Sequence, residues 1–529
     1  MERFFNTAGS IQDDIHYAVD PLQRWDLEAV MALIQQQKYF VLHAPRQTGK
    51  TSTLLSMVKL LNSQSTYEAV HVNIESAQVQ REDVENAMRT IASEIAARHY
   101  YFTGSQMLID KWLELSEHYT AITVVAELLT YWASNTAKPV VLMLDEVDAL
   151  VGDTLISLLR QIRSSYDKRP KGFPVSIVLC GVRDVCDYRI HSAATKEIIT
   201  GGSPFNIKAE SLLLSNFTKE DIANLYQQHT KATGQQFASE VFDLCWKYTA
   251  GQPWLVNALA HEVTSNMREN QDRSVVITAE KFEQAKERLI LRRDTHLDQL
   301  TDKLREDRVR RVIQPILSGD SVLAEVHPDD IQYVMDLGLI AKKEDRNLAI
   351  SNDIYREVIP RELVWSTQTM LSPPQQSWFT NPNGSLNIEK LLTNFQEFFR
   401  ELSEHWIERF DYKEAGPQLL LQAFLQRIVN GGGMIDREYG LGRRRTDLFI
   451  RFPYSDGVQK VVLELKIVRK TIDATLAEGL EQTADYMDKC GTTDGHLILF
   501  DRSTERTWDD KIYTKTEQFQ GKTIQVWGC

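Results

Sequence analysis

The sequence predicts an α/β protein in which a parallel sheet is covered by helices on both faces and is followed by a separate, second α/β domain. In the first 210 residues, short apolar runs that are typical of buried strands alternate with amphipathic helical stretches. A tight loop at residues 44–51 joins the first of these strands to a helix. Much later, charged residues interrupt an apolar run at residues 461–467. The two stretches indicate two chemical sites in one chain.

Length and composition bound the number of domains and the kind of partner. A chain of 529 residues corresponds to roughly three to four domains, and 43% hydrophobic with 25% charged residues is ordinary for a globular protein. The formal net charge is −13, so the molecule as a whole is not a passive binder of polyanions. Any contact with nucleic acid must therefore come from a local basic patch.

Cysteine usage and the distribution of apolar residues bear on the compartment. The five cysteines are scattered and lack the spacing of metal ligands, which is typical of reduced thiols in the cytosol. The first residues lack the basic-then-apolar order of a signal peptide, and no apolar run approaches the length that spans a bilayer. We therefore expect a cytoplasmic protein with no membrane partner.

The loop at residues 44–51 has the pattern of a phosphate-binding P-loop, with Ala44 in place of the usual first glycine. It joins a strand to a helix, so its backbone N–H groups would converge on an anion at a helix N-terminus. Gly49 lets the backbone approach closely, Lys50 would reach the β- and γ-phosphates, and the Thr51 hydroxyl would bind Mg²⁺. The sequence therefore predicts a site for ATP and Mg²⁺.

A continuous apolar run at residues 139–144 is typical of a central parallel strand and ends in Asp145 and Glu146. Ligands bind at the carboxyl ends of such strands, so we expect Asp145 to bind the same Mg²⁺ as the P-loop. Glu146 would orient or deprotonate the attacking water.

Arginines that follow the predicted strands are candidates for contact with the γ-phosphate. A buried strand at residues 175–181 ends just before Arg183, where a polar side chain can reach that phosphate. Arg160, Arg163 and Arg169 are alternatives, and any of these arginines could act across a subunit interface. The residues expected to bind the nucleotide are Ala44, Pro45, Arg46, Gln47, Thr48, Gly49, Lys50, Thr51, Ser52, Asp145 and Arg183.

The chain up to about residue 370 resembles the AAA-like P-loop ATPases, in the branch that contains STAND and archaeal-type ATPases. The motifs that carry the resemblance are residues 44–51, 144–148, 181–183, 203–205 and 251–253. It implies an ATPase core at 1–210, a helical lid at 211–275 and a winged-helix-like domain at 276–370. No clear arginine-finger motif is present, so the size of the expected homo-oligomer stays open.

A winged-helix pattern, a linker and a last domain follow one another after the predicted lid. A helix at residues 327–337, followed by a hairpin-like pair, is a winged-helix pattern. The helix is acidic, which favours a regulatory or assembly role over the reading of DNA bases. Prolines, asparagines and a glycine at residues 371–385 indicate a linker, and residues 386–529 form the last predicted domain.

Glu464 and Lys466 interrupt the apolar run at residues 461–467. Side chains two apart on a strand share a face, so these two would point the same way, and an antiparallel strand before them would bring Asp447 close. Two carboxylates with a lysine suit Mg²⁺-dependent hydrolysis of phosphodiesters, in which the acids bind the metal and the lysine stabilises developing charge. Glu414 on an upstream helix is a further candidate ligand. Incidental surface charge, the simpler explanation, does not account for charges inside an apolar run.

This helix–hairpin–strand order resembles the PD-(D/E)XK nuclease superfamily. Asp447 matches the motif aspartate, with Thr446 where the family has proline, and residues 464–466 match the E-x-K element. Gln482 and Tyr486 match the Q-x-x-x-Y element of the RecB-like branch. The resemblance implies a restriction-endonuclease-like domain that a strand at 496–500 closes. The catalytic residues it implies are Asp447, Glu464, Lys466, Glu414, Gln482 and Tyr486, with Glu146 in the ATPase.

Basic residues gather at this second site although the whole chain is acidic. Between positions 437 and 470, nine arginines and lysines accompany four acids. Such an island is what binding of a phosphate backbone requires.

The two resemblances together imply an ATP-regulated, Mg²⁺-dependent DNA nuclease, with RNA as the other substrate class. A fusion of this kind resembles bacterial defence effectors that act against phage or plasmid DNA. Two alternatives stay open: a switch or assembly protein whose nuclease fold only binds nucleic acid or a partner, and a DNA-repair nuclease.

Overall fold

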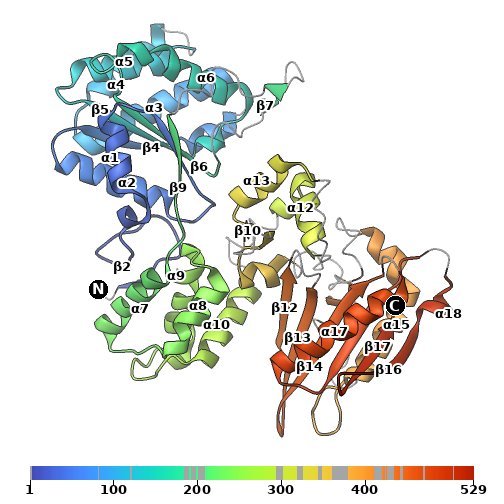
Figure 1. Cartoon of the computed structure of the whole chain (residues 1–529). Coiled ribbons are helices and arrows are strands. Elements are labelled where there is room, and N and C mark those ends of the chain that lie inside the picture. Colours follow the sequence, from blue (N-terminus) through green and yellow to red (C-terminus); the bar gives the residue numbers. More distant parts are fainter. Residues whose placement is uncertain are drawn as a thin grey trace. The chain divides into compact units, whose positions relative to one another are not determined.

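The computed structural model contains two compact units, Met1–Leu289 with Asp336–Gly338 and Ile290–Met335 with Leu339–Cys529 (Figure 1). The residues that it describes are 3–80, 83–118, 122–183, 190–191, 198–199, 209–292, 302–317, 326–342, 348–359, 379–409, 417, 420–422, 424–425, 434–440, 445–468, 471–503 and 506–529. Within these ranges, no helix is both long enough and apolar enough to cross a membrane.

A five-stranded sheet forms the centre of the first unit, and all of its strands are parallel. In spatial order the strands are β4 (Glu68–Asn73), β5 (Val140–Asp145), β6 (Ser176–Gly181), β3 (Phe40–His43) and β9 (Glu210–Leu213). The parallel sheet is therefore confirmed, and the carboxyl ends of its strands meet at one edge.

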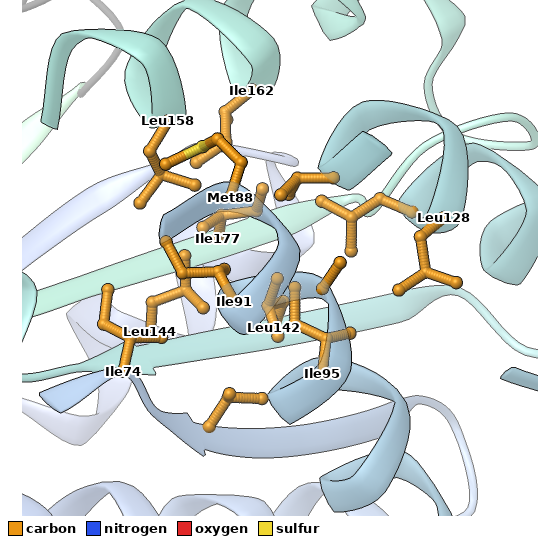
Figure 2. Close-up of a cluster of buried hydrophobic side chains, with 14 of the residues drawn as sticks. Ile74, Met88, Ile91, Ile95, Leu128, Leu142, Leu144, Leu158, Ile162 and Ile177 are labelled. Atoms are coloured by element: carbon orange, nitrogen blue, oxygen red, sulfur yellow. The ribbon is translucent and has the colours of Figure 1, made fainter. Parts of the chain in front are cut away.

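Helices cover both faces of this sheet, and the side chains of β5 show why the strand is apolar throughout. Val141 and Met143 pack into a cluster with the first two helices, whereas Leu142 and Leu144 pack into the cluster of the opposite face (Figure 2). A strand that is buried on both faces needs an apolar residue at every position. The helices are α1 (Leu27–Gln35), α2 (Lys50–Ser63), α3 (Val84–Thr103), α4 (Met107–His118), α5 (Val124–Asn135) and α6 (Gly152–Ser164).

Helix α3 illustrates how local sequence sets the limits of an element. Its cap, Asp83, accepts a hydrogen bond from Asn86 N, and Gly104 ends the helix at a φ of 73°. Both features are typical of helix ends. Between them, Met88, Ile91 and Ile95 recur at helical spacing and are buried against the sheet (Figure 2).

The last strand of the sheet corrects the predicted boundary of the lid. We expected the lid to begin at residue 211, but β9 covers Glu210–Leu213 and pairs with β3. This short edge strand is only partly buried, so it lacks the apolar run that marks the other strands. The lid helices that follow are α7 (Lys219–Thr233), α8 (Ser239–Thr249), α9 (Pro253–His261) and α10 (Ala279–Arg292).

The segment before α1 packs against the lid. Strands β1 (Phe4–Phe5) and β2 (His16–Tyr17) pair in parallel, and the Phe5 ring lies 5.6 Å from that of Tyr226 on α7. Gln228, also on α7, donates to Ala18 O at 2.8 Å and accepts from Ala18 N at 3.2 Å. The chain then turns through a short 3₁₀ helix, Pro21–Arg24, into α1.

The second unit begins with a helical region and a short hairpin. Helices α12 (Asp307–Leu317) and α13 (Pro328–Asp336) precede β10 (Ile340–Lys342) and β11 (Leu348–Ile350), which pair antiparallel. The predicted order of an acidic helix followed by a hairpin is confirmed. Two of its acids differ in exposure: the Asp330 side chain pairs with Arg308 at 3.3 Å and is 14% exposed, whereas that of Asp329 is 48% exposed.

A six-stranded mixed sheet fills the rest of the second unit. In spatial order its strands are β12 (Met434–Gly440), β13 (Arg445–Tyr454), β14 (Gly457–Ile467), β15 (Gly495–Phe500), β17 (Lys522–Gly528) and β16 (Tyr513–Phe519). The predicted strand at 496–500 therefore does not close the sheet, because β17 and β16 extend it. The helices are α15 (Ile388–Arg409), α17 (Ile472–Cys490) and α18 (Trp508–Lys511).

Glu68, the first residue of β4, ties this strand to two helices. Its carboxylate accepts from Trp132 Nε1 at 2.5 Å, from Thr136 Oγ1 at 2.8 Å and from His99 Nε2 at 3.3 Å. Burial alone would raise the pKa of Glu68, but these hydrogen bonds outweigh it and lower the pKa to about 2.

Replacing Glu68 with glutamine should therefore lower the stability of the first unit by roughly 1–3 kcal/mol near pH 7. The folded-state pKa of about 2 lies below the ordinary 4.5, so the stabilisation is complete above pH 4.5 and is lost as the pH falls toward 2. Calorimetric melting of both proteins at neutral and acidic pH should show a difference that shrinks with acidification.

Glu85→Gln is the matched control, because Glu85 forms an exposed pair with Arg89 at 3.2 Å. Its effect should stay below about 0.5 kcal/mol. An equal loss in both variants, or a difference that persists at low pH, would contradict the role of Glu68.

Candidate functional site

The loop between β3 and α2 has the backbone conformation that phosphate binding needs. Gly49 caps α2 at a φ of 89°, and a Cβ atom there would lie 2.9 Å from Arg24 Nη1. Gln47 also has a positive φ, of 56°. The loop therefore places the free N–H groups of the α2 N-terminus beside the carboxyl edge of the sheet.

Lys50 lies inside this loop. Its ammonium group is buried and donates to Ala44 O at 3.0 Å and to Pro45 O at 3.1 Å. Thr48 Oγ1 also donates to Pro45 O, at 2.8 Å. These bonds hold the lysine and the loop together as one cationic cradle, which suits the β- and γ-phosphates of a nucleotide.

Asp145 and Thr51 come together as the sequence predicts. Thr51 Oγ1 donates to Asp145 Oδ2 at 2.7 Å, and Asp145 is fully buried. Burial alone would raise the pKa of Asp145, but hydrogen bonds from His71 and Thr51 hold the pKa below its usual value. An ionised carboxylate beside a hydroxyl is a donor set that fits Mg²⁺.

Glu146 is the next residue and has strained backbone geometry. Its φ of 58° and ψ of 40° lie in the left-handed region, which costs a non-glycine residue about 1–3 kcal/mol. Burial and the nearby charge of Asp148 raise the pKa of Glu146. A carboxylate with a raised pKa at this position suits acceptance of a proton from the attacking water.

A pocket opens beside the P-loop. The chain segment at residues 6–21, the P-loop and the lid line it together. Trp254, in the lid, donates through Nε1 to Thr7 O at 2.8 Å and so joins two of these walls. Ser52 Oγ accepts from Ile11 N at 3.1 Å. The pocket lies beside the P-loop, on the side where the base and ribose of a nucleotide held there would lie.

Arg24 ties the P-loop to the start of the lid. Its guanidinium donates to Thr48 O and to Ser215 O and lies 5.1 Å from the centre of the Phe217 ring. Burial lowers the pKa of Arg24 to about 10, although the charge of Asp221 opposes the shift. Arg24 therefore stays charged near neutral pH and holds the loop in place.

The predicted arginine contacts stay predictions. Arg183 is buried, and its Nε donates to Asp336 Oδ2 at 3.1 Å within the first unit. Arg169 donates through Nε to Tyr166 O and lies over the rings of Tyr166 and Tyr39. Arg160 and Arg163 lie on the exposed side of α6, and Arg46 is exposed in the P-loop.

The second predicted site lies on β14 and α17. Lys466 Nζ lies 2.8 Å from Glu464 Oε1, and both side chains are buried. The same ammonium donates to Gln482 Oε1, and Gln482 Nε2 donates to Glu478 Oε1 at 3.4 Å. The sequence prediction that Glu464 and Lys466 share a face is therefore confirmed.

The Glu464 carboxylate is shielded from water but lacks the hydrogen bonds that would replace its hydration. Its residue is 0% exposed, and neither oxygen accepts a hydrogen bond from the described residues. The contact with Lys466 is an ion pair by distance, without the angles of a hydrogen bond. A buried anion in this state is costly unless a further cation satisfies it.

The other predicted residues of this site have different outcomes. Asp447 lies directly opposite Glu464 in the antiparallel register of β13 and β14, and its side chain lies outside the described part of the chain. Tyr486 is buried in the apolar cluster between α17 and the sheet. Glu414 lies outside the described residues. Among the described side chains, no group of three or more acids, histidines or cysteines gathers around a metal position.

Sequence reasoning missed Arg24, His71 and Trp254. His71 stands between the apolar residues Val70 and Val72 of β4, beside the strand that ends in Asp145, and this was the available signal. Trp254 directly follows the Gly-Gln-Pro element of the lid. Arg24 had no signal, because its partners are backbone carbonyls far along the chain.

A family model described as an AAA-like domain matches residues 22–360, and no curated protein is significantly similar in sequence. The Walker-type ATPase PABY2304 of Pyrococcus abyssi is a structural neighbour with 13% identity and a TM-score of 0.48, over 67% of this chain and 99% of that one. Cdc6p from Pyrobaculum aerophilum has 14% identity and a TM-score of 0.36, over 65% and 93%.

The Thermotoga maritima RuvB Holliday junction branch migration motor has 13% identity and a TM-score of 0.33, over 63% of this chain and 92% of its own. These structural likenesses are too distant to carry substrates or partners to this chain. The family match covers the sheet, the P-loop and the lid.

Glu146→Gln should separate nucleotide binding from hydrolysis. The variant keeps the cradle around Lys50 but loses the proton acceptor, so we expect ATP affinity within a few fold of wild type and hydrolysis slower by about 100-fold. Lys50→Ala should lose affinity as well. Equilibrium titration with ATP and phosphate release measure the two quantities.

The exposed acid Glu75, replaced by glutamine, is the control and should change neither quantity. Retained hydrolysis in Glu146→Gln would contradict the assignment, as would a loss of affinity equal to that of Lys50→Ala.

Proposed function

This chain belongs to the AAA-like domain family, and we propose that it is an ATP-regulated nuclease that cleaves DNA with the help of Mg²⁺. Its first unit is a P-loop ATPase, with Lys50, Thr51 and Asp145 assembled at the carboxyl edge of a parallel sheet. The nuclease part rests on one observation in the second unit, the buried and unsaturated carboxylate of Glu464 beside Lys466.

The physical cost of this arrangement supports a catalytic role. Glu464 and Lys466 lie on a strand whose other neighbouring residues are apolar and buried. An ion pair in such a place is often no more stable than apolar residues of similar size. Stability therefore gives little reason for the pair, whereas metal binding and charge stabilisation at a phosphate require both groups.

The chain's residues divide the work as follows. Glu464 and Asp447 would hold the ion from neighbouring strands, since their positions are paired in register. Bound Mg²⁺ would polarise the phosphate and lower the pKa of its water. Lys466, kept in place by Gln482, would stabilise the negative charge that develops on the phosphate. Thr51 and Asp145 would hold the ion that accompanies ATP.

We assign control to the P-loop and cutting to β14. A nucleotide can shift a conformational equilibrium of the protein only if it binds the two conformations with different affinities. We propose that ATP and ADP favour different conformations, so that hydrolysis changes the balance between them. An ATPase joined to a nuclease in one chain suits inducible destruction of foreign DNA, so we propose a role in defence against phage or plasmids. An assembled homo-oligomer is part of this proposal.

Purified full-length protein with Mg²⁺ and ATP should cut plasmid DNA, and Glu464→Gln should abolish the cutting. Lys466→Met should slow it by about 100-fold, because one electrostatic stabiliser of the transition state is removed. Gel analysis of a plasmid and of a labelled RNA decides the substrate class.

The matched controls are Glu517→Gln and Lys515→Met. These residues are also two apart on a strand of the same sheet and pair at 2.8 Å, but their side chains are 34% and 39% exposed. They should cut at the wild-type rate. Absence of cutting with every nucleotide and both substrates would overturn the nuclease proposal, as would full activity of Glu464→Gln.

A further inference from the structure

His71 lies on β4 with its imidazole buried against the carboxylate at the end of β5. The side chain is 3% exposed, and Nε2 lies 3.1 Å from Asp145 Oδ2. The register pairs His71 with Met143, two positions before Asp145. Nothing in the P-loop motif itself requires a histidine here.

Arg98 determines which ring nitrogen carries the hydrogen. Its Nη2 lies 3.4 Å from His71 Nδ1, and its Nε donates to His71 O at 3.2 Å. A guanidinium has N–H donors and no acceptor, so Nδ1 must be the acceptor of that contact. The hydrogen is therefore on Nε2, which donates it to Asp145 Oδ2.

Aromatic rings on α3 hold Arg98 in turn. The guanidinium lies 5.0 Å from the centre of the Tyr101 ring and 5.2 Å from that of Phe102. These cation–π contacts and the bond to the β4 backbone restrict the guanidinium on two sides. The orientation of His71 is thus set from α3 as well as from its own strand.

Both oxygens of Asp145 thereby have fixed donors. Oδ2 accepts from Thr51 Oγ1 at 2.7 Å and from His71 Nε2, while Oδ1 accepts from Glu146 N at 3.0 Å. The carboxylate cannot rotate without losing one of these bonds. Thr51 must turn an oxygen lone pair toward Mg²⁺ while its hydrogen stays on Asp145, so a second donor on the same oxygen keeps the pair aligned.

We propose that His71 is a positioning residue for Mg²⁺: it holds Asp145 in the orientation through which Mg²⁺ strengthens ATP binding. The inference adds a residue to the P-loop site. It rests on the ATP-binding part of the proposed function and is independent of the nuclease part.

The test is the gain in ATP affinity that Mg²⁺ provides, measured as the ratio of the dissociation constants in EDTA and in Mg²⁺. His71→Leu should reduce this ratio by about tenfold and leave the affinity in EDTA within twofold of wild type. His71→Gln, whose amide nitrogen can replace Nε2 as a donor, should recover most of the ratio. A merely structural role would weaken binding equally in both conditions.

His99→Leu is the matched control. His99 is also a buried histidine paired with a carboxylate of β4, Glu68, at 3.3 Å, but it lies at the opposite end of the strand. Its ratio should equal that of wild type. If His71→Leu does not fold, Arg98→Met replaces it, and a threefold or larger loss of the ratio is then expected.

Two outcomes overturn the inference: an unchanged ratio in the folded His71 or Arg98 variant, and an equal loss in His99→Leu. Wild-type protein that binds no ATP in either condition would instead contradict the proposed ATP-binding function, so the two failures are distinguishable.

Discussion

A carboxylate on a buried strand has to be partnered, and both candidate sites of this chain depend on that constraint. Asp145 and Glu464 are each 0% exposed. Asp145 meets the constraint through neutral donors, Thr51 and His71, that also fix its orientation. Glu464 has the ammonium of Lys466 nearby and no hydrogen bond within the described residues. The first site is therefore preorganised, whereas we propose that a bound cation would supply the missing partner at the second.

The parallel sheet brings the partners of Asp145 together at one edge. Because β3, β4 and β5 all end at the same edge, the P-loop, the end of β4 and Asp145 approach one another without any special connection. Lys50 and Thr51 then follow from the first turn of α2, whose N-terminus faces that edge. The lid and the chain before α1 add the pocket beside it.

Sequence patterns predicted the central strands that are buried on both faces and missed two edge strands. β5 and residues 461–467 of β14 are apolar runs, so they were predictable together with the charges that end the first and interrupt the second. β9 and β16 are edge strands whose residues are all exposed or only partly buried, and nothing in their composition separates them from a loop. The register of β13 against β14 followed from hairpin geometry, which made the pairing of Asp447 with Glu464 predictable.

The sequence did not predict which side chains from elements far apart in the chain would contact each other. Arg98 on α3 contacts His71 on β4, and Arg24 contacts Ser215, which is 191 residues away in the sequence. Such contacts depend on how a helix packs on a sheet. The periodicity of a helix predicts which of its faces is buried, but it does not predict which residue of the sheet that face contacts. Trp254, by contrast, directly follows a recognisable lid element and could have been included.

The claim that ATP at the P-loop controls cutting at β14 is tested most directly by plasmid cleavage in Mg²⁺ with ATP, ADP, a non-hydrolysable ATP analogue or no nucleotide, in wild type and in Lys50→Ala. The account predicts that the wild-type rate differs severalfold among these conditions and that Lys50→Ala cuts at one rate in all of them. Cleavage that is independent of nucleotide in wild type, or equally dependent on it in Lys50→Ala, would contradict the account.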